Sequence, residues 1–318
     1  MNIVVMGAGA LGSVFGGFLA KAGHQVTLVG RAPHIATIRD HGLQIQGIWG
    51  EYLIDNLGAC TTTAEVPRQN LDLVLITTKS YDTEHAARQI LPLLSEKTLV
   101  ISVQNGLGNV ETISQVVGDH RAAGARVIFG VEAVAPGRVE ITVYADKVIL
   151  GSPSDGVDYR RIEETAGAFT QAGIPTEATR EIDKFIWGKL LYNCCLNALS
   201  ALLEVAYGEL GERVETREIM ASVIGEIFAV AQRKGIGLAW TSPPEYEKLL
   251  LERLIPDTYS HHASMLQDVS RGKRTEIDSL NGAITRLGEE VGIPTPVNRM
   301  LTQLVKAKEQ VSKGQQPG

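Results

Sequence analysis

The chain has 318 residues, 44% hydrophobic and 21% charged, a balance that excludes wholesale disorder. A formal net charge of −6 excludes a protein-wide basic surface for nucleic acid. The three cysteines include the adjacent pair Cys194 and Cys195, so a disulfide framework and a cysteine-rich zinc site are excluded, and a reducing compartment is favoured.

The run from Met1 to Ala20 is apolar, but it does not fit a signal peptide. No Lys or Arg precedes the run, and glycines interrupt it throughout. No uncharged run reaches the ~20 apolar residues of a membrane span. We therefore predict a folded strand and helix here, and a cytoplasmic protein with no membrane or nucleic-acid partner.

The first half of the chain alternates strand and helix patterns. Apolar runs rich in β-branched residues predict buried parallel strands at residues 2–6, 25–29, 71–77 and 98–103. Helical patterns lie between them at residues 10–22 and 82–94. Extended runs at 126–134, 139–143 and 147–150, around a Pro136-Gly137 turn, predict antiparallel strands that complete the sheet. A helix at 158–172 and a short strand at 175–179 follow.

After Asp183 the strand signals end and long helical patterns take over. They cover residues 184–203, 214–234, 244–254, 275–291 and 296–311, and a small, polar tail at 312–318 is expected to fray. We therefore predict an α/β fold: a Rossmann-type, doubly wound parallel sheet over residues 1–180, followed by an all-α C-terminal domain over residues 181–318.

A glycine-rich turn directly follows the first predicted strand and opens the first helix. In this context Gly7 allows the tight turn, Gly9 lets the backbone approach a pyrophosphate, and Gly12 lets helix and strand pack closely. The helix N-terminus would present free N–H groups to the phosphates. The sequence predicts a dinucleotide site made by Gly7, Ala8, Gly9, Ala10, Leu11 and Gly12; a turn without a ligand is the alternative.

The end of the second strand indicates which dinucleotide is bound. An NAD site places an Asp or Glu there for the ribose 2′-hydroxyl, but no acid occurs from Gly7 to Arg39. Arg31 can instead bind a 2′-phosphate with its planar guanidinium group. We therefore predict NADPH, with a solvated Arg31 as the alternative.

Two later strands are followed by polar groups at their carboxyl ends, where ligands bind in such sheets. Lys79 could neutralise a phosphate or a substrate carboxylate, and Asn105 could hold the nicotinamide ribose and the substrate. Each residue taken singly is also compatible with an ordinary loop.

The predicted helix at 184–203 is mostly apolar, yet it carries a polar stripe. Lys189, Asn193 and Asn197 are four residues apart and fall within about 80° of one another around the helix. Burying these groups without partners is costly, so they either satisfy one another or face a polar ligand. Because partial burial lowers the pKa of a lysine, Lys189 is a candidate general acid. His261 and His262 are the rival acids.

A second polar stretch joins two predicted helices. Ser264 and Glu276 stand twelve residues apart, with basic residues between them. By itself this stretch favours a solvated surface over a functional site.

Over essentially its whole length the sequence resembles the 2-dehydropantoate 2-reductase (ketopantoate reductase) family. The segments that carry the resemblance are GAGALG at 7–12, Arg31, Lys79 in TTKS, QNGLG at 104–108, KLLYNCCLN at 189–197 and SMLQDVSRGKRTEIDSLNG at 264–282. The last two are specific in combination. The resemblance implies NADPH-dependent reduction of 2-dehydropantoate to (R)-pantoate, in pantothenate and coenzyme A biosynthesis.

The resemblance also implies a role for each matching residue. Lys189 matches the proton donor, and the substrate-binding positions match Asn105, Asn193, Asn197 and Ser264. The cofactor-binding positions match the glycine-rich turn at 7–12, Arg31, Lys79, Asn105, a small residue near Ala133, and Glu276, which also supports the active site.

One departure keeps other functions open: Tyr207 stands where some members of the family carry Asn. A related NADP-dependent reductase or dehydrogenase acting on another 2-oxo or 2-hydroxy acid is therefore an alternative. A non-catalytic NADPH-binding sensor is another, although it would need no polar stripe. No residue cluster predicts a metal site, and the apolar helices of the second domain are compatible with a homodimer.

Overall fold

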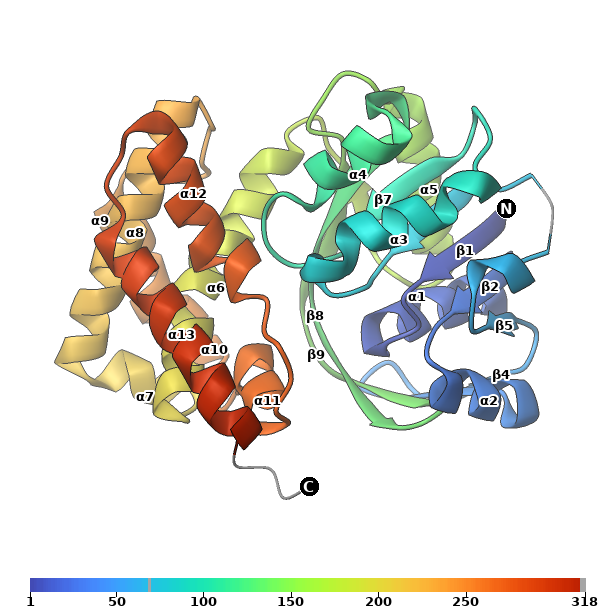
Figure 1. The fold of residues 1–318 in the computed structure, drawn as a ribbon, viewed down its shortest axis with the longest axis horizontal. Helices are drawn as coiled ribbons and strands as arrows, with labels where there is room; N and C mark the ends of the chain where they lie inside the picture. The colour runs from blue at the N-terminus through green and yellow to red at the C-terminus, as the bar shows by residue number, and fades with distance from the viewer. Residues whose placement is uncertain (68–69, 315–318) are drawn as a thin grey trace. The chain divides into compact units, whose positions relative to one another are not determined.

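The computed structural model describes residues 1–67 and 70–314 (Figure 1). The chain divides into two compact units: residues 1–104 with 109–182, and residues 105–108 with 183–318. The expectation of a frayed tail from residue 312 is wrong in its first part, because the last helix, α13 (Pro296–Gly314), includes Ser312 and Gly314. Residues 315–318 lie outside the described part.

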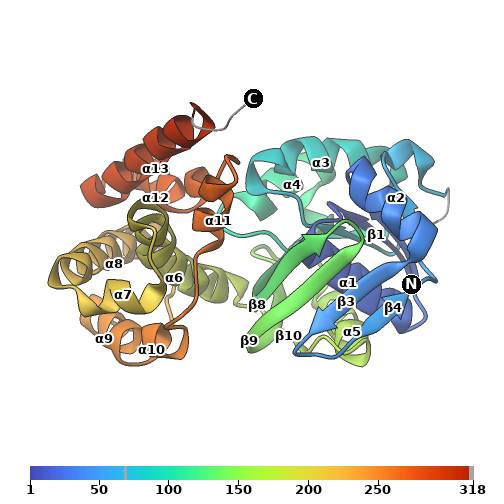
Figure 2. The same cartoon turned by 90° about the horizontal axis from the view of Figure 1, so that it is seen from below.

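The first unit is built on one mixed sheet dominated by parallel pairs (Figures 1 and 2). Its strands run in the order β4-β3-β9-β8-β7-β6-β1-β2-β5, with β10 beside β9. Only β3–β4 and β8–β9 pair antiparallel among the described strands. The strands are β1 (Asn2–Met6), β2 (Gln25–Val29), β3 (Leu43–Gly47), β4 (Tyr52–Ile54), β5 (Gly58–Cys60), β6 (Leu73–Ile76), β7 (Leu99–Ser102), β8 (Ala122–Ala135), β9 (Arg138–Gly151) and β10 (Thr176–Ala178).

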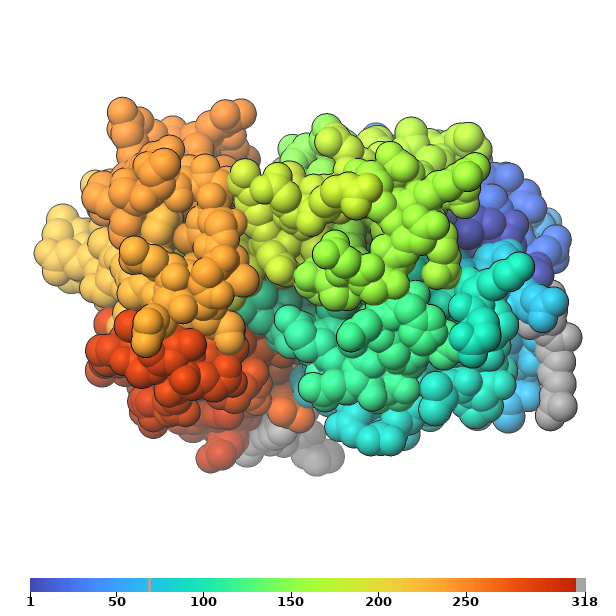
Figure 3. All heavy atoms as spheres, turned by 90° about the horizontal axis from the view of Figure 1, so that it is seen from above, coloured from blue at the N-terminus to red at the C-terminus, as the bar shows by residue number. Residues whose placement is uncertain are grey.

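Helices cover both faces of this sheet, which confirms the predicted doubly wound fold. The helices are α1 (Ala10–Lys21), α2 (Ala32–His41), α3 (Thr83–Ile90), α4 (Asn109–Val117) and α5 (Tyr159–Gln171). Atoms of α3, α4 and α5, coloured cyan to yellow-green, form much of the first unit's surface on the face shown in Figure 3.

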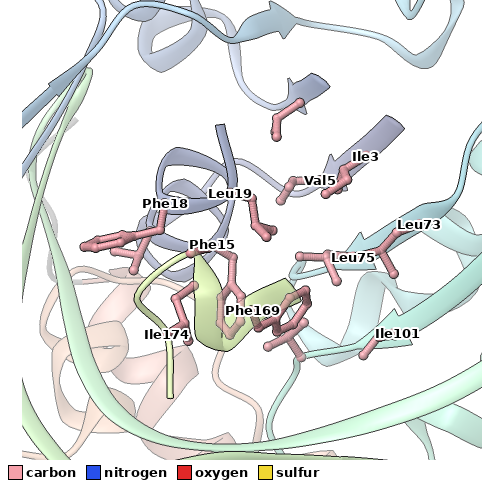
Figure 4. Close-up of a cluster of buried hydrophobic side chains, with 14 of the residues drawn as sticks. Ile3, Val5, Phe15, Phe18, Leu19, Leu73, Leu75, Ile101, Phe169 and Ile174 are labelled. Carbon is pink, nitrogen blue, oxygen red and sulfur yellow. The ribbon is translucent and has the colours of Figure 1, made fainter. Parts of the chain in front are cut away.

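The central strands β1, β6 and β7 are apolar except at Asn2 and Ser102, because both of their faces are buried. Along β1, Ile3 and Val5 join the core under α1 and α5, whereas Val4 and Met6 join the core under α3 and α4. In the first of these cores the rings of Phe15 and Phe169 meet edge to face, 5.5 Å apart between centroids (Figure 4). The period of two along a strand thus divides one short segment between two cores.

The second unit is helical among its described residues. Its helices are α6 (Ile182–Leu203), α7 (Tyr207–Glu212), α8 (Val214–Lys234), α9 (Pro243–Leu249), a π-helical turn (Leu250–Leu254), α10 (Ile255–Asp257), α11 (Ser264–Ser270), α12 (Asn281–Val291) and α13. By length and composition α6 could cross a membrane, but 67% of its most apolar window is buried inside the protein, as in a core helix.

Several sequence-based element predictions are wrong in detail. The helix predicted at 82–94 is regular only over α3, and Leu91–Leu93, which includes Pro92, forms a 3₁₀ turn. The helix predicted at 275–291 begins only at Asn281. Before it, the Thr275 hydroxyl accepts the N–H of Ile277, and Glu309 accepts the N–H of Thr275. Side-chain acceptors of this kind compete with helical hydrogen bonds.

The start of α13 is held by a carboxylate from α8. Glu226 accepts the backbone N–H groups of Val297 and Asn298, at 2.8 and 3.0 Å, and the side-chain amide of Asn298 at 2.7 Å. The first N–H groups of a helix have no acceptor within it, so Glu226 acts as a cap from another helix.

We expect Glu226→Ala to lower the free energy of unfolding by about 1–2 kcal/mol, the usual cost of losing a helix cap. Glu226→Gln should cost less because it keeps an acceptor oxygen. Chemical denaturation measures both, with Glu218→Ala, an exposed glutamate on the same helix, as the control. Equal stability of Glu226→Ala and the parent would contradict the capping role.

Candidate active site

The glycine-rich turn predicted to bind a dinucleotide lies between β1 and α1. Gly7 has a φ of +110°, and a Cβ there would lie 2.7 Å from the backbone nitrogen of Thr78. A Cβ at Gly12 would collide with the carbonyl of Gly7 and the hydroxyl of Thr77. Both positions therefore require glycine for the packing of the turn against the loop after β6.

Gly9 differs from its neighbours because the protein does not fill the space beside it. A Cβ at Gly9 would meet only the carbonyl oxygen of Gly7, at 3.9 Å, among the described residues. The N–H groups of Ala10, Leu11 and Gly12 open α1 and have no acceptor in the described part of the chain. An open backbone beside unpaired N–H groups is the arrangement that a pyrophosphate requires.

Arg31 lies two residues after the end of β2, directly after Gly30, and is the N-cap residue of α2. Gly30 packs against Ala8 of the glycine-rich turn, where a Cβ would lie 2.7 Å from that of Ala8. The Arg31 side chain is exposed and makes no hydrogen bond or ion pair within residues 1–67 and 70–314. Its guanidinium group is thus available to an anion near the turn.

His34 is a residue at this site that the sequence did not single out. Its Nδ1 accepts the backbone N–H of Gly137, at 2.9 Å, so the neutral ring carries its proton on Nε2, which lies 3.0 Å from the Ser13 hydroxyl in the first turn of α1. Burial, and next the charge of Arg31, lower the pKa of His34 from its usual 6.5. His34 therefore connects α1 to the β8–β9 hairpin only in its neutral form.

The lowered pKa of His34 predicts a loss of stability in acid. A group whose pKa is lower in the folded protein stabilises the fold above its unfolded pKa of about 6.5, and this contribution is lost as the pH falls through the folded pKa. We expect His34→Asn to flatten the decline in the free energy of unfolding below pH 6.5. His24, whose pKa is also lowered, remains in both proteins, so the comparison isolates His34. If the free energy of unfolding fell equally with pH in His34→Asn and in the parent, this role of His34 would be contradicted.

Polar side chains follow β6 and β7, as predicted. Lys79 lies directly before a 3₁₀ turn (Ser80–Asp82). Gln104 was not predicted to have a role, yet its side-chain amide donates to the carbonyl of Thr78, at 2.9 Å, and to the hydroxyl of Thr83, at 2.8 Å. It therefore joins the loops that follow the two strands.

The second unit places the candidate acid against a residue that is distant in the sequence. The Lys189 ammonium group donates to Oδ1 of Asn105 at 2.6 Å, although 84 residues separate the two. The loop that carries Asn105 is held by a hydrogen bond of 2.9 Å from the Leu107 N–H to the Ser279 carbonyl. The sequence predicted both residues as functional but did not pair them.

The other two residues of the polar stripe are almost buried. Asn193 is 8% exposed and its side chain makes no hydrogen bond among the described residues. Asn197 is 6% exposed, and its Oδ1 accepts the hydroxyl of Tyr207 at 2.6 Å. The stripe is therefore not a self-satisfied network, which leaves amide groups for a ligand.

The remaining predicted residues lie in separate places. Ser264 is exposed at the first residue of α11, and Glu276 is 8% exposed just before the 3₁₀ turn Ile277–Ser279. Since Ser279 holds the loop of Asn105, Glu276 belongs to the segment that supports this loop. Ala133 lies exposed in the outer part of β8, paired with Val139. No described contact joins Ala133 to the glycine-rich turn, so its role stays a prediction.

Comparison with known proteins identifies the family. A sequence-family model described as ketopantoate reductase PanE/ApbA matches residues 3–155. A second family model, described as the C-terminal part of the same family, matches residues 181–309. The chain belongs to the ketopantoate reductase family. A curated family member from Aquifex aeolicus (strain VF5), named 2-dehydropantoate 2-reductase, is 43% identical over 310 residues, which are 97% of each chain.

Solved structures agree with this family assignment. A PanE/ApbA family ketopantoate reductase from Ralstonia eutropha JMP134 is 34% identical, with a TM-score of 0.88 over 98% of this chain and 100% of the other. A D-mandelate dehydrogenase, in a ternary structure with NADH and anilino(oxo)acetate, is 30% identical. Its TM-score is 0.89, over 98% of this chain and 99% of the other.

Membership of the ketopantoate reductase family makes the chain an enzyme, an oxidoreductase that uses a nicotinamide dinucleotide and acts on a small keto acid. The glycine-rich turn fits this cofactor class, because Gly9 leaves the space that a phosphate needs. The polar groups around Lys189 lie in the second unit and fit the keto acid.

Proposed function

We propose that the protein reduces 2-dehydropantoate to (R)-pantoate with NADPH. The hydrogen bond of 2.6 Å between Lys189 and Asn105 is the observation that carries this proposal. It fixes an ammonium group, a donor that a ketone oxygen requires when negative charge develops on it. The curated relative from Aquifex aeolicus bears the name of this activity.

The first unit would hold the cofactor through the groups predicted from the sequence. The N–H groups at the start of α1 would bind the pyrophosphate, and Arg31 would bind the 2′-phosphate that distinguishes NADPH from NADH. Lys79 adds a second positive charge at the carboxyl end of β6. When bound, the cofactor supplies the hydride, and the protein supplies binding, orientation and charge.

The second unit would hold the 2-oxo acid and supply the proton. Lys189 donates a hydrogen bond to the ketone oxygen and then transfers its proton to that oxygen as the hydroxyl forms. Asn105 keeps the ammonium group in position for this transfer. Asn193, Asn197 and Ser264 bind the other oxygens of the substrate, and Glu276 supports the loop of Asn105.

A reductase or dehydrogenase for another 2-oxo or 2-hydroxy acid is the second candidate function. Two observations favour it: the fold is equally similar to that of a D-mandelate dehydrogenase, and the Tyr207 hydroxyl takes up the Oδ1 acceptor of Asn197 in the polar stripe. Both functions need Lys189 and differ only in the remainder of the substrate.

A panel of substrates separates the two functions. Initial rates of NADPH oxidation should be highest with 2-dehydropantoate, compared with pyruvate, 2-oxoisovalerate and phenylglyoxylate at equal concentration. If another 2-oxo acid gave a higher kcat/KM than 2-dehydropantoate, that acid would be the better candidate substrate. Absence of turnover with every acid would favour the NADPH-binding sensor instead.

Location and assembly complete the proposal. We place the enzyme in the cytoplasm, because all three cysteines are free and buried in the structure. A homodimer is compatible with the exposed apolar residues Met300, Leu304 and Val311 of α13. Sedimentation of the purified protein measures the oligomeric state directly.

A further inference from the structure

The Tyr207 phenol is the single described partner of the Asn197 side chain. Its hydroxyl donates to Oδ1 of Asn197 at 2.6 Å, and the Nδ2 group of that amide donates to no acceptor among the described residues. Both residues are almost fully buried, at 2% and 6% exposure. The Nδ2 group is not among the fully buried atoms that lack a partner, so it keeps contact with solvent and is the end of the amide that a ligand can reach.

Two neighbouring aromatic rings restrain the Tyr207 ring. Its ring meets Tyr192 edge to face, 5.7 Å between centroids, and lies 5.1 Å from the ring of His261. The Tyr192 hydroxyl lies 2.8 Å from that of Thr258, which donates to the Leu254 carbonyl, so Tyr192 is the donor of the pair and is fixed as well. The Tyr207 ring thus has little freedom to turn away from Asn197.

The backbone around Tyr207 also anchors the segment that leads to Ser264. The N–H groups of Tyr207 and Gly208 donate to the carbonyls of His261 and Tyr259, at 3.0 and 2.9 Å. These N–H groups open α7 and would otherwise lack acceptors. One position therefore supports two predicted substrate-binding residues, Asn197 through its side chain and Ser264 through its main chain.

We propose that Tyr207 is a positioning residue, which fixes the Asn197 amide so that its Nδ2 group donates a hydrogen bond to an oxygen atom of the 2-oxo acid substrate. Burial raises the pKa of Tyr207 well above its usual value of 10, so the phenol stays protonated and remains a donor. A donor on Oδ1 prevents the amide from turning over, which selects a hydrogen-bond acceptor as its ligand. This inference rests on the proposed function.

The test compares Tyr207→Phe, which removes only the hydroxyl, with Tyr246→Phe, which removes another buried phenol hydroxyl of the same unit, one that has no hydrogen-bond partner among the described residues. We expect Tyr207→Phe to raise the KM for 2-dehydropantoate roughly 3- to 10-fold, the value of one hydrogen bond. A contact made equally in ground and transition states changes KM alone, so kcat should stay within about two-fold. The KM for NADPH should be unchanged in Tyr207→Phe, and all constants of Tyr246→Phe should match the parent.

A double-mutant cycle distinguishes positioning from a general structural role. If Tyr207 acts through Asn197, Tyr207→Phe should have no further effect on KM in an Asn197→Ala background. The same variants assayed with 3,3-dimethyl-2-oxobutanoate, which lacks only the hydroxyl of 2-dehydropantoate, identify the bound oxygen. A KM increase with both acids indicates the carboxylate end, and an increase with 2-dehydropantoate alone indicates the hydroxyl.

The outcomes that overturn this inference are separate from those that overturn the proposed function. An active parent with an unchanged KM in Tyr207→Phe rejects the positioning role alone. An equal KM increase in the Asn197→Ala background also rejects it, because the effect would then bypass Asn197. A parent that reduces none of the 2-oxo acids rejects the proposed function, and this inference with it.

Discussion

Replacing Lys189 by alanine is expected to lower kcat with 2-dehydropantoate by at least about 100-fold, the lower end of the usual contribution of a general acid. The ammonium group is bound to Asn105 at 2.6 Å and is carried by α6, which contributes many residues to the buried core of the second unit. Alanine removes both the proton and the positive charge that would stabilise the developing alkoxide. Initial rates at saturating NADPH measure this loss.

Lys184→Ala provides the matched control, because Lys184 is another partly exposed lysine on α6. Its kcat should equal that of the parent. If Lys189→Ala retains kcat within a few-fold, another group must protonate the substrate, and His261 or His262 becomes the candidate. Circular dichroism of Lys189→Ala should match the parent, which separates lost chemistry from lost folding.

Arg31→Ala is expected to raise the KM for NADPH roughly 10- to 100-fold and to leave the KM for NADH unchanged. The guanidinium group has no protein partner in the described part of the first unit, so binding a 2′-phosphate breaks no existing ion pair. A charge-assisted hydrogen bond contributes about 1.5–3 kcal/mol, which sets the size of the effect.

Arg160→Ala, an exposed arginine paired with Glu164 on α5, controls for the loss of one positive charge. It should change neither KM. If the parent enzyme had the same kcat/KM with NADH as with NADPH, the role given to Arg31 would be contradicted. The D-mandelate dehydrogenase of similar fold was solved with NADH, so both cofactors must be measured side by side.

The parts of the site that follow from local sequence were predictable. Gly7 to Gly12 require a particular local backbone, and the spacing of Lys189, Asn193 and Asn197 follows from helix geometry. The apolar runs of β1, β6 and β7 likewise indicated that both faces of the sheet are covered by helices.

The parts that depend on distant packing were not predictable. The pairing of Lys189 with Asn105, and of His34 with Gly137, joins residues 84 and 103 positions apart. The late start of α12 depends on Glu309, which lies on α13 and accepts a hydrogen bond from the N–H of Thr275. Helical periodicity describes neighbours within one turn and contains no information on such partners.

The small loop at residues 105–108 has a consequence for attempts to dissect the enzyme. It belongs to the second compact unit although both of its neighbouring segments belong to the first. A gene fragment that starts at residue 183 would encode every helix from α7 onward and Lys189, but it would omit the oxygen to which that lysine is bound. Cutting the chain once near residue 183 would therefore leave neither fragment with a complete unit. A chimaera that joins the helical unit to another dinucleotide-binding domain would also need the segment Asn105–Gly108.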